Sequence, residues 1–153
     1  MPSNRRDLRI KAMQILYAWE ISREPIEQIV RTVGEDLAEE KTQFSMLERL
    51  VYTVLDHRAE CDEIITKLAA NWDFDRIAMI DRILLRIGIC ELFYFPDIPP
   101  KATINEAIEI AKRYSTEKSG KFVNGILDAI LSDLKKTGTL NKSGRGLIGS
   151  KEG

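Results

Sequence analysis

The chain has 153 residues, of which 44% are hydrophobic and 31% are charged, and its formal net charge is −1. This length suits one hydrophobic core, and the balanced charge excludes a disordered chain, so we expect a single domain. Cys61 and Cys90 are too few for a disulfide framework, and no Cys/His cluster has zinc spacing. No segment approaches the roughly 20 apolar residues of a membrane span. We therefore expect a cytoplasmic protein that binds no metal or cofactor and does not enter a membrane.

Helical periodicity begins near the N-terminus. Apolar residues recur on one face as far as Trp19, and Ser3 or Asn4 can cap the start of this first helix. Pro25 suits the first turn of a second helix, which we expect to run to about Glu40.

The middle of the chain continues this pattern. A third helix is predicted from Thr42 to a break around His57, and a fourth follows and ends at "NWDFD". The run from Ile77 to Phe95 is apolar almost all round, which is typical of a central helix with neighbours on several sides. The prolines after it predict an extended connector.

Two further helices complete the pattern. Thr103 and Glu106 have the spacing of a capping box at the start of the first, and the second is predicted to start near Ser119 and end at Lys136. Residues 137–153 lack a periodic apolar face, which predicts a flexible tail. No segment shows strand alternation, so the fold is predicted to be all-α.

Two glycines interrupt predicted helices. Glycine in a helix interior costs about 1 kcal/mol relative to alanine. Gly88 lies in the central helix and Gly125 in the last one. We expect each to mark a place where two helices cross at short backbone distance.

Charge is unevenly distributed. Arg5, Arg6 and Arg9 form a basic N-terminal run interrupted by Asp7. Acids outnumber bases in residues 24–63, and bases outnumber acids again in residues 112–121. Such a chain could present two surfaces to two kinds of partner, one of them a polyanion. For either basic stretch alone, a solvated helix face is the commoner explanation.

A search for catalytic motifs finds only fragments. "STEK" from Ser115 and "KTG" from Lys136 match motifs of penicillin-recognising acyl transferases, but only a helix separates them and that fold needs a mixed sheet. The single histidine, His57, lies on a long helix, where a general base is the less common role. We therefore expect that the protein is not an enzyme.

Four segments together point to a known family. They are "RRDLRIKAMQILYAWE", "DRILLRIGICEL", "INEAIEIAKRYS" and "KFVNGILDAI", in this order between residues 4 and 135. The chain thereby resembles the NusB family of bacterial transcription antitermination proteins. The resemblance implies about seven helices in two small bundles, forming one domain over residues 1–136, and no catalysis.

The resemblance also implies partners. It implies binding to the boxA element of nascent ribosomal RNA and a heterodimer with NusE, a small-subunit ribosomal protein. The pair would join the other Nus factors on RNA polymerase and suppress termination. Whether the free protein is a monomer or a homodimer stays open.

The candidate RNA site combines the two basic stretches into one surface for single-stranded RNA. Cationic side chains suit phosphates, and an aromatic ring at a helix start can stack on an unpaired base. The predicted residues are Arg5, Arg6, Arg9, Lys118, Lys121, Phe122 and Asn124. Two alternatives stay open: Phe122 is buried on the stripe with Ile126, and Asn124 orients a helix crossing.

The candidate NusE surface lies at the beginning of the central helix. Asp75 and Asp81 offer acids to a basic ribosomal protein, unless Asp81 pairs only with Arg82 or Arg86. Two other functions stay open. One is an RNA-targeting module of the kind that precedes the catalytic domain of RNA cytosine methyltransferases, and the other is a helical adaptor that binds only proteins. One continuous basic face favours RNA, and separated patches favour the adaptor.

Overall fold

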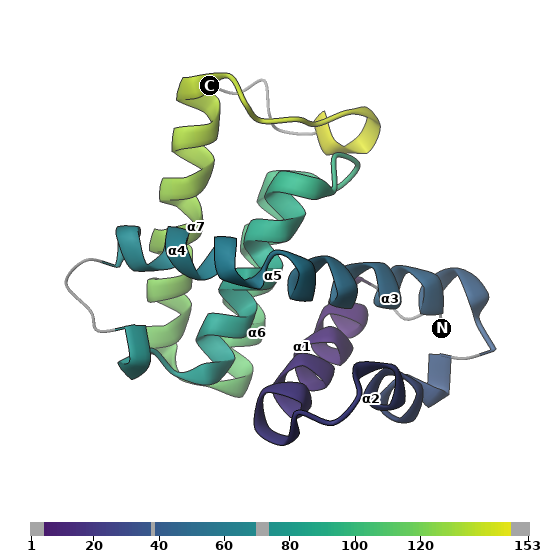
Figure 1. The fold of residues 1–153 in the computed structure, drawn as a ribbon. Helices are drawn as coiled ribbons and strands as arrows, with labels where there is room; N and C mark the ends of the chain where they lie inside the picture. Colours follow the sequence, from purple (N-terminus) through teal and green to yellow (C-terminus); the bar gives the residue numbers. More distant parts are fainter. Residues whose placement is uncertain (1–4, 38, 70–73, 148–153) are drawn as a thin grey trace. The chain divides into compact units, whose positions relative to one another are not determined.

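The first of two compact units, Met1–Asp56, holds three helices in the computed structural model of the chain (Figure 1). The structure describes residues 5–37, 39–69 and 74–147. The elements of this unit are α1 (Arg5–Ser22), α2 (Ile26–Val33), a 3-10 turn (Glu35–Leu37) and α3 (Lys41–Asp56). Helix α1 packs against α2 and α3. Its buried residues include Leu8, Ala12 and Ile15, whose spacing of three to four positions gives one apolar face.

The second predicted helix is shorter than expected. Pro25 is its N-cap, but α2 ends at Val33 and a 3-10 turn follows, so the prediction of one helix to Glu40 was wrong. Gly34 is the C-cap of this helix: its N–H donates to the Val30 carbonyl, and glycine fits there because a Cβ would lie 3.0 Å from a Leu47 methyl group. The proposed caps Ser3 and Asn4 lie outside the described residues.

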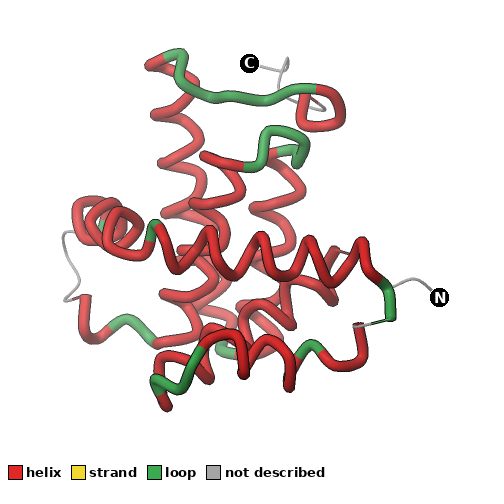
Figure 2. The backbone as a smooth tube through the Cα atoms, turned by 45° about the vertical axis from the view of Figure 1, so that its right-hand side comes forward, coloured by secondary structure: helices red, strands yellow, loops and turns green. Residues whose placement is uncertain are grey.

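The second unit, His57–Gly153, holds the other four helices. Its elements are α4 (Arg58–Leu68), a 3-10 turn (Phe74–Arg76), α5 (Met79–Tyr94), α6 (Pro100–Tyr114), α7 (Glu117–Thr137) and a 3-10 turn (Gly144–Leu147). Helices α5, α6 and α7 run side by side in alternating directions, and α4 packs against α5 and α7 (Figure 1). Figure 2 shows helix and loop but no strand among the described residues, which confirms the all-α prediction with seven α-helices. The predicted domain boundary at residue 136 stays a prediction.

Helix α5 is the centre of this unit. It is buried from Ile83 to Leu92, as its apolar circumference predicted. A Cβ on Gly88 would lie 2.9 Å from both Cδ atoms of Leu127, so the expected close approach between α5 and α7 is confirmed. A Cβ on Gly125 would meet nothing within 4 Å, so the same expectation was wrong for that glycine.

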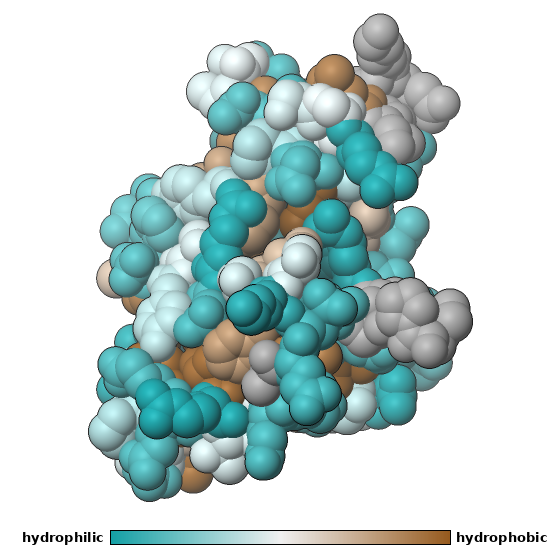
Figure 3. Space-filling view, turned by 90° about the vertical axis from the view of Figure 1, so that its right-hand side faces the viewer, coloured by the Kyte–Doolittle hydropathy of each residue, from teal (hydrophilic) through white to brown (hydrophobic). Residues whose placement is uncertain are grey.

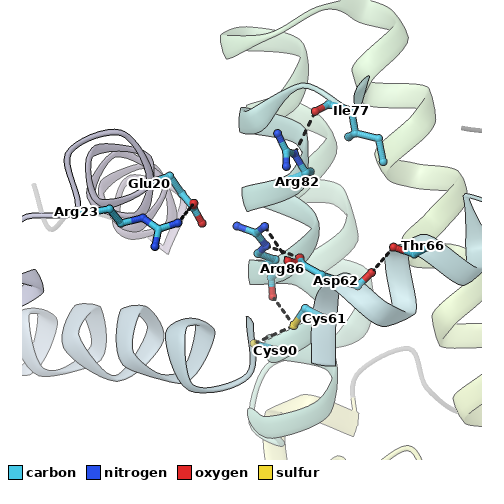
Figure 4. Close-up of polar contacts among 9 residues, drawn as sticks. All are labelled: Glu20, Arg23, Cys61, Asp62, Thr66, Ile77, Arg82, Arg86 and Cys90. Atoms are coloured by element: carbon cyan, nitrogen blue, oxygen red, sulfur yellow. Dashed lines mark hydrogen bonds and ion pairs between the residues drawn. The ribbon is translucent and has the colours of Figure 1, made fainter. Parts of the chain in front are cut away.

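An ion pair between the buried Arg86 and the partly exposed Asp62 joins α5 to α4 (Figure 4). Nε and Nη2 of Arg86 donate to the two carboxylate oxygens of Asp62 at 2.7 and 3.0 Å. Near this pair, the Sγ atoms of Cys61 and Cys90 lie 3.8 Å apart. The contact with Cys61 and burial both raise the pKa of the Cys90 thiol, so it stays protonated and packs as a small apolar group.

The start of α6 differs from the predicted capping box. Pro99 is the N-cap and Pro100 the first helical residue, because proline needs no N–H partner in the first turn. Thr103 therefore lies inside the helix, where its Oγ1 donates to Oε1 of the buried Glu91 at 2.6 Å. The capping role that we predicted for Thr103 and Glu106 was wrong.

Beyond α7, the chain folds back over the end of α5 (Figure 1). Helix α7 ends at Thr137, and Nζ of Lys142 donates to the carbonyls of Glu91 and Phe95 at 3.0 and 2.9 Å. Gly146 lies so close to the Pro96 carbonyl that a Cβ would overlap it. Within the predicted tail 137–153, the segment up to residue 147 makes these contacts, and residues 148–153 lie outside the described part. The flexibility of this tail stays a prediction.

Hydrophilic side chains cover most of the face shown in Figure 3, with apolar side chains visible between them, as is usual for a folded domain. No helix in the described part of the chain is long and apolar enough to cross a membrane.

Candidate nucleic-acid interface

The first turns of α7 carry the candidate RNA-binding residues of the second unit. The helix begins at Glu117, two residues before the predicted start, and Oγ1 of the N-cap Thr116 accepts from the Ser119 N–H at 3.0 Å. Lys118 and Lys121 are exposed beside this helix start. The helix dipole places partial positive charge at the same end, so the segment favours an anion.

Phe122 lies between two pockets on this segment. The buried stripe of α7 consists of Val123, Ile126, Leu127 and Ile130. Phe122 is outside this set and only half-buried. It lines two pockets of about 290 Å³ each, one of them together with Lys121 and Gly125. Phe122 therefore keeps accessible surface, which full burial would have removed.

Asn124 is half-buried one residue before Gly125 and lines neither of these two pockets. Its predicted RNA contact therefore stays a prediction, as does its alternative role at a helix crossing. The absence of a neighbour at Gly125 removes one reason for the crossing role.

The second pocket beside Phe122 contains a buried acid. Asp81 is 6% exposed, and its Oδ2 accepts from the Ser119 hydroxyl at 2.8 Å. Ser119 Oγ lies 2.9 Å from Ser115 Oγ and 3.1 Å from Thr116 Oγ1, so the hydroxyls form a short chain that ends on the carboxyl group. Within the described residues, Oδ1 of Asp81 has no hydrogen-bond partner. Burial raises the pKa of Asp81, and the hydroxyls of Ser119 and Ser115 partly oppose this rise.

The alternative pairing of Asp81 with a neighbouring arginine is wrong. Arg86 is bound to Asp62, and the Arg82 Nε donates to the Ile77 carbonyl at 3.1 Å. Of the two acids predicted to contact NusE, Asp75, in the turn before α5, is exposed and Asp81 is buried, and the NusE contact itself stays a prediction.

The three N-terminal arginines differ in exposure. Arg5 is exposed, Arg6 is half-buried, and Arg9 is 4% exposed. Arg5 and Arg9 are four residues apart in α1, the spacing that predicted a shared phosphate-binding face. Burial leaves the Arg9 guanidinium with little surface for such a contact, so the exposed cationic surface of α1 comes from Arg5 and Arg6.

Sequence reasoning missed the contact between Asp81 and Ser119. One signal was available: an acid in a largely apolar central helix needs a hydrogen-bond donor when it is buried. The position of that donor, 38 residues away, is set by the packing of α5 against α7. No group of three His, Cys, Asp or Glu side chains among the described residues could hold a metal ion.

The helical fold and its cationic, aromatic helix terminus define a class: an all-helical binding protein. Comparison with known proteins gives the family. Residues 6–132 of the chain match the NusB family. The transcription antitermination protein NusB of Salinibacter ruber is 51% identical over 148 residues, which cover 96% of this chain and 92% of that protein. The chain belongs to the NusB family.

Solved structures agree with this assignment. A T. maritima NusB structure matches with a TM-score of 0.78 and 39% identity, covering 87% of this chain and 94% of that one. A crystal structure of antitermination factors NusB and NusE in complex with double-stranded RNA matches with a TM-score of 0.71 and 30% identity. It covers 84% of this chain and 96% of the matched chain.

Proposed function

We propose that this protein is a non-enzymatic transcription antitermination factor of the bacterial cytoplasm that binds boxA-type RNA in nascent ribosomal RNA transcripts. Its family membership supports the role, since its relative in Salinibacter ruber is named as a transcription antitermination protein. The start of α7 supports the binding chemistry, because exposed lysines there flank a half-buried aromatic ring. Single strands are the form of RNA whose bases such a ring can reach.

Each residue of the α7 segment has a distinct role in this proposal. Lys118 and Lys121 contact phosphates, and Phe122 stacks on an unpaired base. The accessible surface of the Phe122 ring between two pockets is the observation that carries the site. Arg5 and Arg6 of the first unit add phosphate contacts to the same RNA.

We further propose NusE as the protein partner. A solved relative is in complex with NusE, and ribosomal proteins are basic. Asp75 supplies an exposed carboxylate for that partner at the start of α5. The heterodimer on RNA then joins the other Nus factors on RNA polymerase. The free protein is a monomer or a homodimer, and its molar mass in solution, measured by light scattering, distinguishes the two states.

The test is an anisotropy titration with labelled single-stranded boxA RNA, with and without NusE. A scrambled strand and a boxA duplex serve as competitors. Tighter binding of the single-stranded boxA RNA than of both competitors, strengthened by NusE, supports the proposal. Equal affinity for boxA and scrambled RNA at all salt concentrations contradicts it.

Two variants locate the site within that titration. Phe122→Leu keeps an apolar side chain but removes the π face, so we expect a loss of about 1–3 kcal/mol of RNA affinity without a change in salt dependence. Lys121→Ala should lower the salt slope by about 0.7, the contribution of one phosphate contact on a single strand. Lys135→Ala is the matched control, because that lysine is exposed on the same helix about 21 Å further along its axis.

A further inference from the structure

Residues 138–147 fold back along the second unit, after the part of the chain that matches the NusB family (Figure 1). We call them the C-terminal strap. Gly138 turns the chain at the end of α7 with a φ of +69°, which glycine adopts without strain. The Ser143 N–H donates to the Pro96 carbonyl at 3.0 Å, and Gly146 is buried against the same carbonyl. Backbone contacts therefore hold the second half of the strap on the connector between α5 and α6.

Lys142 fastens the strap to α5 through its side chain. It is half-buried, and its Nζ donates to the carbonyls of Glu91 and Phe95 at 3.0 and 2.9 Å. The same two carbonyls also accept backbone N–H groups, from Phe95 and Ile98 respectively. Helix α5 therefore keeps its own hydrogen bonds when the lysine leaves, so the strap can open without unfolding α5.

The contacts of Nζ satisfy the lysine in its neutral form. A neutral amine has two N–H bonds, and the described part of the chain gives Nζ two acceptors, whereas an ammonium ion has three N–H bonds. Burial lowers the pKa of Lys142 to about 8 from 10.5, and the carboxylates of Glu91 and Asp97 oppose this change. At a pH near 8, about half of the Lys142 side chains are then neutral, with a free lone pair on Nζ. A lysine with the ordinary pKa would be neutral in about 0.3% of molecules.

We propose that Lys142 is a modification site for acyl phosphates and that its acylation releases the C-terminal strap. The lone pair of Nζ attacks the carbonyl carbon of the acyl phosphate. An N–C bond forms, the C–O bond to the phosphate breaks, phosphate leaves, and the amine gives one proton to water. The product amide is uncharged and has one N–H where the amine had two. At least one of the two carbonyl contacts is then lost, which weakens the hold of the strap on α5.

The expected rate follows from two opposing effects. The larger neutral fraction favours Lys142 by about 150-fold over an ordinary lysine at a pH near 8. The lower basicity reduces the reactivity of the lone pair by about tenfold, with the Brønsted slope of about 0.4–0.5 that describes thiols. We therefore expect Lys142 to react about tenfold faster than an ordinary lysine.

The first experiment measures acetylation by acetyl phosphate at each lysine with peptide mass spectrometry. Lys136 is the reference, because it is exposed in the last turn of α7. Near pH 8 the folded protein should acetylate Lys142 about tenfold faster than Lys136, and the chain unfolded in urea should acetylate both within about threefold of each other. The Lys142 rate in the folded protein should level off above about pH 8. Equal rates at the two lysines of the folded protein, or a Lys142 rate that rises as in the unfolded chain, overturn the inference.

The second experiment measures release of the strap. Lys142 is replaced by Nε-acetyllysine through genetic code expansion, and the same replacement at Lys136 is the matched control. Hydrogen exchange is followed by NMR at the amides of Ser143 and Gly146, which donate to the Pro96 and Ser143 carbonyls. We expect exchange at least about tenfold faster after acetylation at Lys142, since hydrogen bonds from charged groups are the stronger ones. Exchange within α5 should stay at the wild-type rate, as should all exchange in the control.

Two substitutions separate the charge from the acyl group. Lys142→Gln removes the charge and should open the strap as acetylation does, whereas Lys142→Arg keeps the charge and the donors and should keep exchange slow. Circular dichroism melting confirms that each protein is folded at the assay temperature. Wild-type exchange in both the acetylated protein and Lys142→Gln would mean that Lys142 does not hold the strap, and the inference would be overturned. RNA takes no part in either experiment, so the proposed function is tested separately.

Discussion

Two glycines in neighbouring helices should respond to the same substitution with opposite signs. Gly125→Ala adds a methyl group where nothing lies within 4 Å, so only the helix propensity changes. We expect the free energy of unfolding to rise by about 1 kcal/mol. Gly88→Ala gains the same propensity but places its Cβ 2.9 Å from both Cδ atoms of Leu127, which is fully buried.

The cost at Gly88 follows from that distance. Overpacking of a dense core costs about 1–3 kcal/mol, which outweighs the propensity gain of about 1 kcal/mol and leaves a net loss of about 1 kcal/mol. The two variants should then differ by about 2 kcal/mol in the free energy of unfolding.

Urea denaturation followed by helical circular dichroism measures this difference through the midpoint, with the slope checked for constancy. The wild type should lie between the two variants. If Gly88→Ala proves as stable as Gly125→Ala, the close packing of α5 on α7 is not as described, and the argument from the Leu127 contact is refuted.

Three further changes test the contacts that hold the second unit together. Asp62→Ala removes the carboxylate that pairs with the buried Arg86 guanidinium and should cost about 3 kcal/mol of unfolding free energy in urea melts, whereas a loss below about 1 kcal/mol would mean that water replaces the carboxylate. Thr103→Val removes the donor to buried Glu91 at nearly constant volume, and calorimetry should show a loss of about 1–3 kcal/mol. Lys142→Met tests the C-terminal segment. Burial lowers the pKa of Lys142 from 10.5 to about 8, and the carboxylates of Glu91 and Asp97 oppose this change. Between these two values the unfolded chain binds the extra proton, so wild-type stability should rise with pH relative to Lys142→Met, and parallel pH profiles would contradict this.

Periodicity was sufficient to predict the helices because their apolar faces repeat over many residues. The central helix is the clearest case, since a segment apolar almost all round must have neighbours on several sides, and α5 has them. Predicted ends were less accurate. Thr103 and Glu106 have capping-box spacing, but Pro99 and Pro100 start the helix earlier, and the sequence alone does not rank these two signals.

The candidate site shows a similar division. The charges and the aromatic ring at the start of α7 follow one another in sequence, so a local pattern could predict them together. Burial could not be predicted in this way. Arg9 and Asp81 are charged, and their residue type predicts exposure to solvent. Both are nevertheless buried, because their environment depends on residues distant in the chain. For Asp81 that residue is Ser119, on a different helix.

The charge contacts at the start of α7 are the central claim, and the salt dependence of RNA affinity tests them most directly. The measurement compares the wild type with Lys118→Ala/Lys121→Ala on single-stranded boxA RNA over a range of salt concentrations. Each phosphate contact on a single strand contributes about 0.7 to the slope of log K against log salt, so we expect the double variant to lower the slope by about 1.4. The control Lys135→Ala/Lys136→Ala, at the other end of the helix, should keep the wild-type slope. An unchanged slope in the Lys118→Ala/Lys121→Ala protein would contradict the proposed interface.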